Sequence, residues 1–166
     1  MKGSLFTKIL YATDLSETAK KAARYAVSLA HEYGAELTVV NVVPDLVEEM
    51  SAGMGYDLAG YFGQEQLNGF YLEGLAESKK AMIKRVHRLL QEAADELGND
   101  LVQPKVEVKV GHPVKQIVEM VTDGGYDLVI MGTHGHSMLD DILLGSVARG
   151  VVKKSPVPVL TVRLND

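Results

Sequence analysis

Residues 127–135 read Asp-Leu-Val-Ile-Met-Gly-Thr-His-Gly, and residues 145–154 read Gly-Ser-Val-Ala-Arg-Gly-Val-Val-Lys-Lys. The first stretch is a strand candidate that ends in two closely spaced glycines, and the second opens a helix candidate with a Gly-Ser pair. Glycines let backbone N–H groups approach a ligand without an intervening side chain. The first turn of a helix adds unpaired N–H donors at the positive end of its dipole. Together the two stretches are typical of a strand–loop–helix unit that holds an anion.

The bulk properties of the chain exclude several classes of function. Its 166 residues predict a single compact domain over residues 1–166. The absence of cysteine rules out disulfides and thiolate chemistry, and a net charge of −5 argues against nucleic acid as the main partner. No apolar run approaches the ~20 residues that span a bilayer, and the amino terminus enters a strand-like run rather than a signal peptide. We therefore expect a cytoplasmic protein that binds neither nucleic acid nor membranes.

Apolar strand candidates alternate with helix candidates along the chain. This alternation is the signature of a parallel sheet that is covered by helices on both faces. Gly34 and Gly98 follow the first two helices as C-terminal caps, and Pro113 begins the third. We expect strands at residues 8–13, 37–43, 105–110, 128–131 and 157–162, and helices at residues 16–33, 75–97, from 113 onward and 146–154.

Differences among the strands predict their order in the sheet. The first, second and fourth are almost continuously apolar, as interior parallel strands are. The third alternates Lys-Val-Glu-Val-Lys-Val, and the last, which begins at Val157 and ends at Val162, contains Pro158; both features indicate edge strands. The expected fold class is therefore α/β, an open five-stranded parallel sheet in the order 3-2-1-4-5 with short right-handed crossovers.

This order places the candidate anion site at a position where such sheets bind ligands. Ligands of open α/β sheets lie at the carboxyl ends of the strands, where the strand order reverses. In the order 3-2-1-4-5 that point lies between strands one and four. Asp14 follows strand one and the Gly132 loop follows strand four. The strand order and the glycine spacing thus indicate the same crevice.

One long segment, residues 44–74, separates the second strand from the second helix. It carries six glycines among methionine, tyrosine and phenylalanine residues. Loops of this length are usually functional or disordered, and this one is too apolar for a plain linker. We interpret it as an insertion that forms a mobile flap or a contact surface for a partner protein. The alternative is a variable insertion that packs on its own domain or on a subunit partner.

Several motifs resemble those of the universal stress protein family, over nearly the whole chain. They include Ile-Leu-Tyr-Ala-Thr-Asp-Leu-Ser at 9–16, Val-Asn-Val-Val at 40–43 and Gly-His-Pro at 111–113. The most specific is the G-x-x-G, nine residues, G-S spacing from Gly132 to Ser146, which is similar to the ATP-binding branch. The resemblance implies a Rossmann-like domain that binds ATP, with or without Mg²⁺ or Mn²⁺. It also implies a homodimer in which the last strands pair across the dyad.

The resemblance assigns roles to individual residues as well. Asp14 would meet the adenosine near the ribose, and Val42 would line the adenine pocket. Gly132 and Gly135 would pass the backbone close to the ribose and phosphates, and residues 145–147 would supply phosphate donors. No catalytic residue and no metal ligand is predicted. The predicted cofactor-binding set is Ala12, Thr13, Asp14, Val42, Met131, Gly132, Thr133, His134, Gly135, His136, Gly145, Ser146 and Val147.

Two departures from the family pattern affect the phosphate end of the site. The position after Gly135, often Arg or Lys in the family, is His136, and Asp140 and Asp141 occupy a stretch that is often basic. If these carboxylates face the phosphates, they weaken triphosphate binding unless a divalent cation intervenes; the alternative is that they face solvent. ATP remains the leading ligand.

Some of these candidates have competing structural roles. Asp14 and Glu17 could form a capping box for the first helix, or Ser16 could be the cap. Either arrangement is compatible with ligand binding by Asp14. His134 and His136 form an H-x-H pair, which alone provides too few ligands for a metal site.

The leading interpretation is an adenine-nucleotide-binding regulatory protein of the stress response, which acts as a dimeric switch rather than a fast catalyst. A second interpretation is a slow ATP hydrolase or phosphotransfer protein with water or Ser146 as acceptor. The sequence offers it no Walker lysine and no assigned base. A third is a dimeric adaptor without functional nucleotide binding, in which residues 44–74 bind another protein. Nucleotide affinity, ATP turnover and partner capture distinguish the three.

Overall fold

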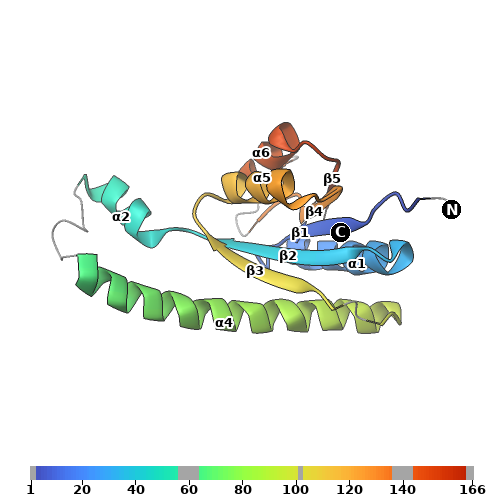
Figure 1. The fold of residues 1–166 in the computed structure, drawn as a ribbon, viewed down its shortest axis with the longest axis horizontal. Coiled ribbons are helices and arrows are strands. Elements are labelled where there is room, and N and C mark those ends of the chain that lie inside the picture. Colours follow the sequence, from blue (N-terminus) through green and yellow to red (C-terminus); the bar gives the residue numbers. More distant parts are fainter. Residues whose placement is uncertain (1–2, 56–63, 101–102, 136–143, 164–166) are drawn as a thin grey trace.

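The computed structural model describes residues 3–55, 64–100, 103–135 and 144–163. Five parallel strands form one sheet in the order β3-β2-β1-β4-β5, which confirms the expected order and the two expected edge strands. The elements are β1 (Lys8–Ala12), α1 (Glu17–Tyr33), β2 (Glu36–Val43), α2 (Leu46–Met54), α4 (Gln64–Leu97), β3 (Lys105–Val110), α5 (Pro113–Gly124), β4 (Leu128–Gly132), α6 (Ser146–Lys154) and β5 (Val159–Val162), as Figure 1 shows.

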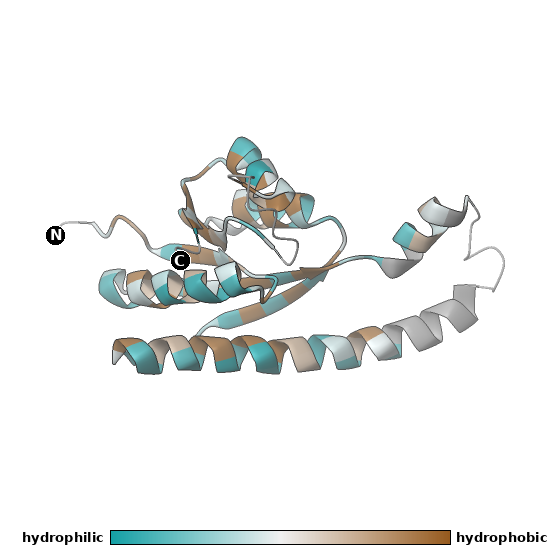
Figure 2. Cartoon of the chain, turned by 180° about the vertical axis from the view of Figure 1, so that it is seen from behind, coloured by the Kyte–Doolittle hydropathy of each residue, from teal (hydrophilic) through white to brown (hydrophobic). Residues whose placement is uncertain are grey.

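Helices cover both faces of the sheet, α1 and α4 on one and α5 and α6 on the other (Figure 1). The core under α1 and α4 includes Ile9, Val27 and Leu90. The core under α5 and α6 includes Leu10 and Val151. Because Ile9 and Leu10 are neighbours on β1 and point to opposite faces, both must be apolar. Figure 2 shows apolar residues running through the central strands.

The outer strand β3 carries charge on one face. Its Glu107 carboxylate pairs with Lys105 at 2.6 Å and with Lys109 at 3.0 Å. The hydrogen bond from Lys105 holds the pKa of the Glu107 carboxyl below its ordinary value, and burial opposes this effect. Charges of this kind on an edge strand discourage pairing with other chains.

Small residues hold α1 close to the sheet. Its stripe of Ala19, Ala22, Ala23, Ala26, Val27 and Ala30 is buried throughout. Gly34 ends the helix with a φ of 61°, the left-handed conformation that glycine adopts at low cost. This close approach matters for the site, because the first turn of α1 lies directly against the end of β4.

The segment at residues 44–74 differs from the expected loop. α2 and an α4 that begins at Gln64 rather than at residue 75 make most of its described part helical, and residues 56–63 lie outside the described ranges. The long-loop interpretation is therefore wrong for these parts. The reason is that an isolated glycine lowers the stability of a helix by only about 1 kcal/mol relative to alanine. The 34-residue α4 therefore continues through Gly69 and Gly74. In Figure 1, α2 and the beginning of α4 extend beyond the end of the sheet.

Helix α4 is long, with 34 residues, but it is not apolar enough to cross a membrane. Among the helices that the structure describes, α4 included, none combines the length and the apolar character needed to cross a membrane.

Candidate functional site

A cavity of about 410 Å³ opens at the carboxyl ends of β1 and β4, where the strand order reverses. It lies on the side of the sheet that α5 and α6 cover. Twelve of the thirteen predicted residues line it, and the thirteenth, His136, lies outside the described residues. The lining consists of Ala12, Thr13, Asp14, Ala19, Val40, Val42, Pro113, Ile117, Met131, Gly132, Thr133, His134, Gly135, Gly145, Ser146, Val147 and Ala148.

Five lining residues were not predicted: Ala19, Val40, Pro113, Ile117 and Ala148. Most of them are apolar residues that also belong to the core, so nothing in their type marks them as ligand contacts. Pro113 and Ile117 lie one turn apart at the start of α5 and were detectable, since the Gly-His-Pro motif begins that helix. Together with β2 they give one end of the cavity an apolar wall.

Backbone hydrogen bonds join the end of β4 to the start of α6 and to β5. The N–H of Thr133 donates to the Val162 carbonyl at 2.9 Å, and its carbonyl accepts from the N–H of Gly145 at 2.8 Å. A Cβ on Gly145 would lie 3.2 Å from the Thr133 carbonyl oxygen and 3.5 Å from the His134 Cα. A glycine at this position therefore lets the start of α6 approach the strand end, and the N–H groups of the first helical turn border the cavity.

The same loop is fastened to the beginning of α1. The His134 carbonyl accepts hydrogen bonds from the hydroxyls of Thr18 and Ser16, the latter at 3.4 Å. Gly132 lies so close to this turn that an added Cβ would be 2.9 Å from the Ala19 nitrogen and from two atoms of Thr18. Gly132 thus lacks a side chain because α1 packs on it, a structural reason that exists without any ligand.

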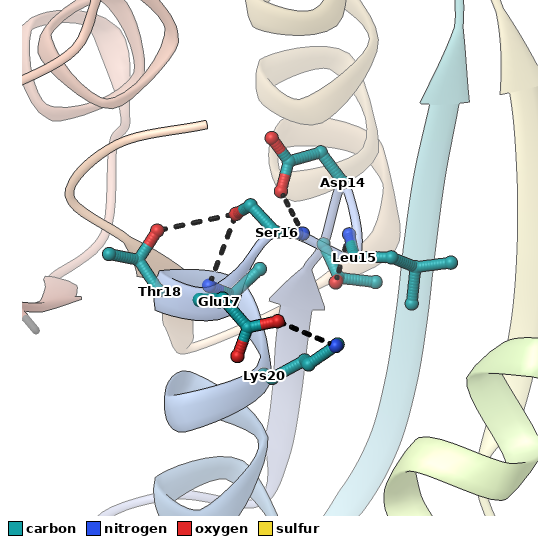
Figure 3. Close-up of polar contacts among 8 residues, drawn as sticks. Asp14, Leu15, Ser16, Glu17, Thr18 and Lys20 are labelled. Carbon is teal, nitrogen blue, oxygen red and sulfur yellow. Dashed lines mark hydrogen bonds and ion pairs between the residues drawn. The ribbon is translucent and has the colours of Figure 1, made fainter. Parts of the chain in front are cut away.

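The turn between β1 and α1 is held by its own side chains (Figure 3). Asp14 Oδ1 accepts from the Ser16 N–H at 2.9 Å, and Thr13 Oγ1 accepts from the Leu15 N–H at 3.0 Å. Leu15 has a φ of 63°, a conformation in which non-glycine residues are uncommon. Side-chain hydrogen bonds on both sides of Leu15 compensate for that backbone cost.

The N-cap of α1 is Ser16, whose Oγ accepts from the Ala19 N–H at 3.3 Å. Of the two open alternatives, the Ser16 cap is therefore confirmed and the Asp14–Glu17 capping box is wrong. The Glu17 carboxylate instead pairs with Lys20 at 2.7 Å (Figure 3). The difference arises because Asp14 lies two residues before the N-cap and accepts from the Ser16 N–H itself.

The Asp14 carboxylate is exposed at the cavity rim and lies against the glycine loop. A Cβ placed on Gly135 would be 2.5 Å from Asp14 Oδ2. The missing side chain at Gly135 is what lets the carboxylate occupy this place. The structure thus brings Asp14 and Gly135 together, as the strand order implied.

Asn41 on β2 supports the turn from beneath and was not among the predicted residues. It is 3% exposed, and its Nδ2 donates to the Thr13 carbonyl at 2.8 Å. Its Oδ1 is buried without a protein hydrogen-bond partner among the described residues. The sequence could have predicted a special role for Asn41, because it is a polar residue inside an otherwise apolar strand.

Tyr11, on β1, anchors the same region from the core. Its hydroxyl donates to the Ala19 carbonyl, and burial raises the pKa of the phenol well above its ordinary value. The tyrosine therefore stays neutral and serves as a fixed hydrogen-bond donor to α1.

The arrangement suits an anion that is attached to an apolar group. Pro113 and Ser146 are the first residues of α5 and α6, so the positive ends of two helices border the cavity. The apolar wall lies beside them. In the described part of the chain, no three histidine, aspartate or glutamate residues gather as a metal site would require. The His134–His136 pair lies partly outside that part.

The chain is similar to proteins whose sequences and structures are known. At the sequence level the chain is 33% identical to the universal stress protein MJ0577 of Methanocaldococcus jannaschii over 159 residues, 96% of each chain. The solved structure of MJ0577 superposes with a TM-score of 0.71 at 30% identity and covers 98% of this chain and 99% of that one.

Two more distant structures share the fold at 20% identity. One is a universal stress protein in complex with cAMP, with a TM-score of 0.61 and coverage of 95% of this chain and 96% of that one. The other is the universal stress protein from Archaeoglobus fulgidus in complex with dAMP, with a TM-score of 0.59 and coverage of 95% and 98%. The model of the universal stress protein family matches residues 5–163. The chain therefore belongs to the universal stress protein family.

Proposed function

We propose that the cavity binds an adenine nucleotide and that the chain acts as a nucleotide-dependent regulatory protein of the stress response. One observation carries the proposal: a single cavity joins an apolar wall, a glycine loop and the starts of two helices at the switch point of the sheet. Adenine needs an apolar slot, whereas a phosphate needs N–H and hydroxyl donors. The cAMP and dAMP complexes of proteins with the same fold support the choice of adenine nucleotides.

Under this proposal the ligand has a defined direction. The base lies between Val42 on β2 and the start of α5, and the phosphates lie over the glycine loop against Ser146. Asp14, on the turn between these two ends, is then nearest the ribose. ATP is the ligand that the glycine spacing favours, with or without Mg²⁺ or Mn²⁺.

Replacing Ser146 with alanine is expected to weaken nucleotide binding about fivefold, since one hydroxyl hydrogen bond is worth about 1 kcal/mol. Isothermal titration of ATP, ADP and AMP into protein freed of co-purified ligand measures the change. Ser78→Ala, on the exposed side of α4, is the matched control and should leave affinity unchanged. If none of the three nucleotides binds at millimolar concentration, the proposed function is wrong.

The second part of the proposal is a homodimer through the last strand. β5 is an edge strand, and its half-buried Leu160 leaves apolar surface beside the open edge. The Pro158 carbonyl accepts from the Val129 N–H on β4, and the Val162 carbonyl accepts from the N–H of Thr133, the residue after β4. Because backbone groups alternate in direction along a strand, the N–H groups of Val159 and Thr161 face the free edge. The β5 strand of a second copy, related by a two-fold axis, can accept hydrogen bonds from these N–H groups.

Replacing Thr161 with proline is expected to convert the dimer to a monomer. Proline removes an N–H that faces outward and leaves the ladder to β4 intact. Sedimentation velocity at micromolar concentration measures the state of assembly, and circular dichroism checks that the variant is folded. A wild-type chain that sediments as a monomer would contradict the dimer and leave nucleotide binding untouched.

A protein partner for α2 and the start of α4 is a further candidate function. Both helices extend beyond the sheet in Figure 1, and Met50 on α2 is 50% exposed. Deleting residues 50–70 and comparing partner capture with nucleotide affinity separates this adaptor role from the binding site.

A further inference from the structure

The exposed side of α4 carries a row of positively charged residues. Lys80, Lys84 and Arg88 follow one another at four-residue spacing, and Arg85 lies beside them on the helix. All four residues are exposed, on a helix that lies at the outside of the molecule (Figure 1). Between residues 78 and 91 the sequence contains no aspartate or glutamate. We call these four residues the basic stripe.

Most cations of the basic stripe have no partner of opposite charge within the chain. Lys80 pairs with Glu77 at 3.0 Å, but the two side chains are 70% and 76% exposed, so this pair contributes little. Lys84, Arg85 and Arg88 form no ion pair with any residue that the structure describes. The surface of α4 is therefore locally positive, although the chain as a whole has a net charge of −5.

The spacing of these cations destabilises the free helix. Like charges four residues apart lie next to each other on a helix and repel. Lys80 and Lys84 form one such pair, and Lys84 and Arg88 form a second. A negatively charged partner that binds along the basic stripe removes this repulsion. The charge pattern therefore suits a bound state better than a free one.

The carboxylates on either side of the basic stripe limit the size of the partner. Glu73 and Glu77 precede it, Glu92 and Asp95 follow it on the same side of α4, and all four are exposed. The stripe between them is about 12 Å long. A nucleic acid or an anionic membrane would extend over these carboxylates and be repelled within the Debye length of about 8 Å. A second copy of the stripe would oppose cations with cations. A short acidic segment of a protein meets neither repulsion.

We propose that the basic stripe is a docking surface for an acidic segment of a partner protein. The segment carries carboxylates along about 12 Å, a length that two turns of helix span. Opposite charge attracts and orients the segment, so that binding weakens as salt is added. The inference goes beyond the proposed function and does not require it, because α4 covers the face of the sheet opposite α5, α6 and the cavity. The stripe also lies outside residues 50–70.

The test is the binding of a fluorescent polyglutamate peptide to the full-length chain, measured by anisotropy at low salt. We expect the wild type to bind this peptide, to release it as salt is raised, and to bind no polyglutamine peptide of the same length. Lys84→Glu reverses the charge at the centre of the stripe and should weaken binding at least about tenfold. Lys153→Glu is the charge-matched control, because it makes the same change in net charge on α6, across the sheet. It should change the affinity less than about twofold.

The stability of Lys84→Glu provides a second readout with the opposite sign. The new carboxylate lies between Lys80 and Arg88, so two repulsive pairs become two attractive ones. We expect the melting temperature, measured by circular dichroism without peptide, to rise by about 3 °C. A variant that is more stable and yet binds less has not lost binding by unfolding.

Four outcomes would overturn the proposal. The wild type fails to bind polyglutamate at low salt, or Lys84→Glu and Lys153→Glu weaken binding equally, so that only net charge matters. A single-stranded oligonucleotide or a phosphatidylserine vesicle binds more tightly than polyglutamate at equal concentration of charge, so that the partner is of another class. The melting temperature of Lys84→Glu falls, so that the stripe is not repulsive in the free chain. None of these results bears on nucleotide binding in the cavity.

Discussion

Replacing Gly132 with alanine is expected to destabilise the fold by about 3 kcal/mol or more, whether or not a ligand is present. The added Cβ would lie 2.9 Å from the backbone nitrogen of Ala19, from the carbonyl carbon of Thr18 and from its hydroxyl. Two of these atoms are helix backbone, and α1 buries a continuous stripe against the sheet. The helix cannot move away without opening the core, so the contact must be relieved by partial unfolding. Urea denaturation followed by circular dichroism measures the loss.

Gly135→Ala is the matched control, with the same added methyl group three residues later in the same loop. Its Cβ would meet the far end of the exposed Asp14 side chain, which can rotate away. Stability should therefore remain within about 1 kcal/mol of wild type. Under the proposed function, displacement of Asp14 lowers nucleotide affinity about tenfold, equivalent to about 1.4 kcal/mol. Equal stability of the two variants would show that α1 does not constrain Gly132.

The spacing of the two glycines does not predict what each of them contacts. The G-x-x-G pattern presents Gly132 and Gly135 as equivalent positions for close backbone approach. In the structure Gly132 accommodates α1, and Gly135 accommodates a carboxylate. The partner in each case comes from a segment more than a hundred positions away, which local spacing does not encode. Such a partner becomes visible only when the packing of α1 on β4 is known.

Strand order was predictable because it depends on properties that each strand carries by itself. The alternating charges of residues 105–110 and Pro158 identify two edges, and continuous apolarity identifies the interior. The start of α4 was not predictable on the same basis. Its first turns lie beyond the end of the sheet in Figure 1, and Gly69 and Gly74 suggest a loop in the sequence.

Replacing Asn41 with aspartate is expected to cost about 3 kcal/mol or more at neutral pH. The side chain is 3% exposed, and its Nδ2 donates to the Thr13 carbonyl. An aspartate removes that donor and turns a buried carboxylate toward a carbonyl oxygen. Chemical denaturation of the variant and the wild type across a range of pH measures the difference.

The pH dependence of that loss identifies its cause. Burial raises the pKa of the introduced carboxyl above the value of about 3.9 that it has in the unfolded chain. The protonated form can still donate to Thr13, so the deficit is small in acid and grows as pH rises through the raised pKa. Asn41→Leu, of similar volume and without charge, is the control; it removes the same donor and should show a smaller loss that does not change with pH. If Asn41→Asp lowers the free energy of unfolding equally in acid and at neutral pH, the charge of the carboxylate is not the cause of the loss.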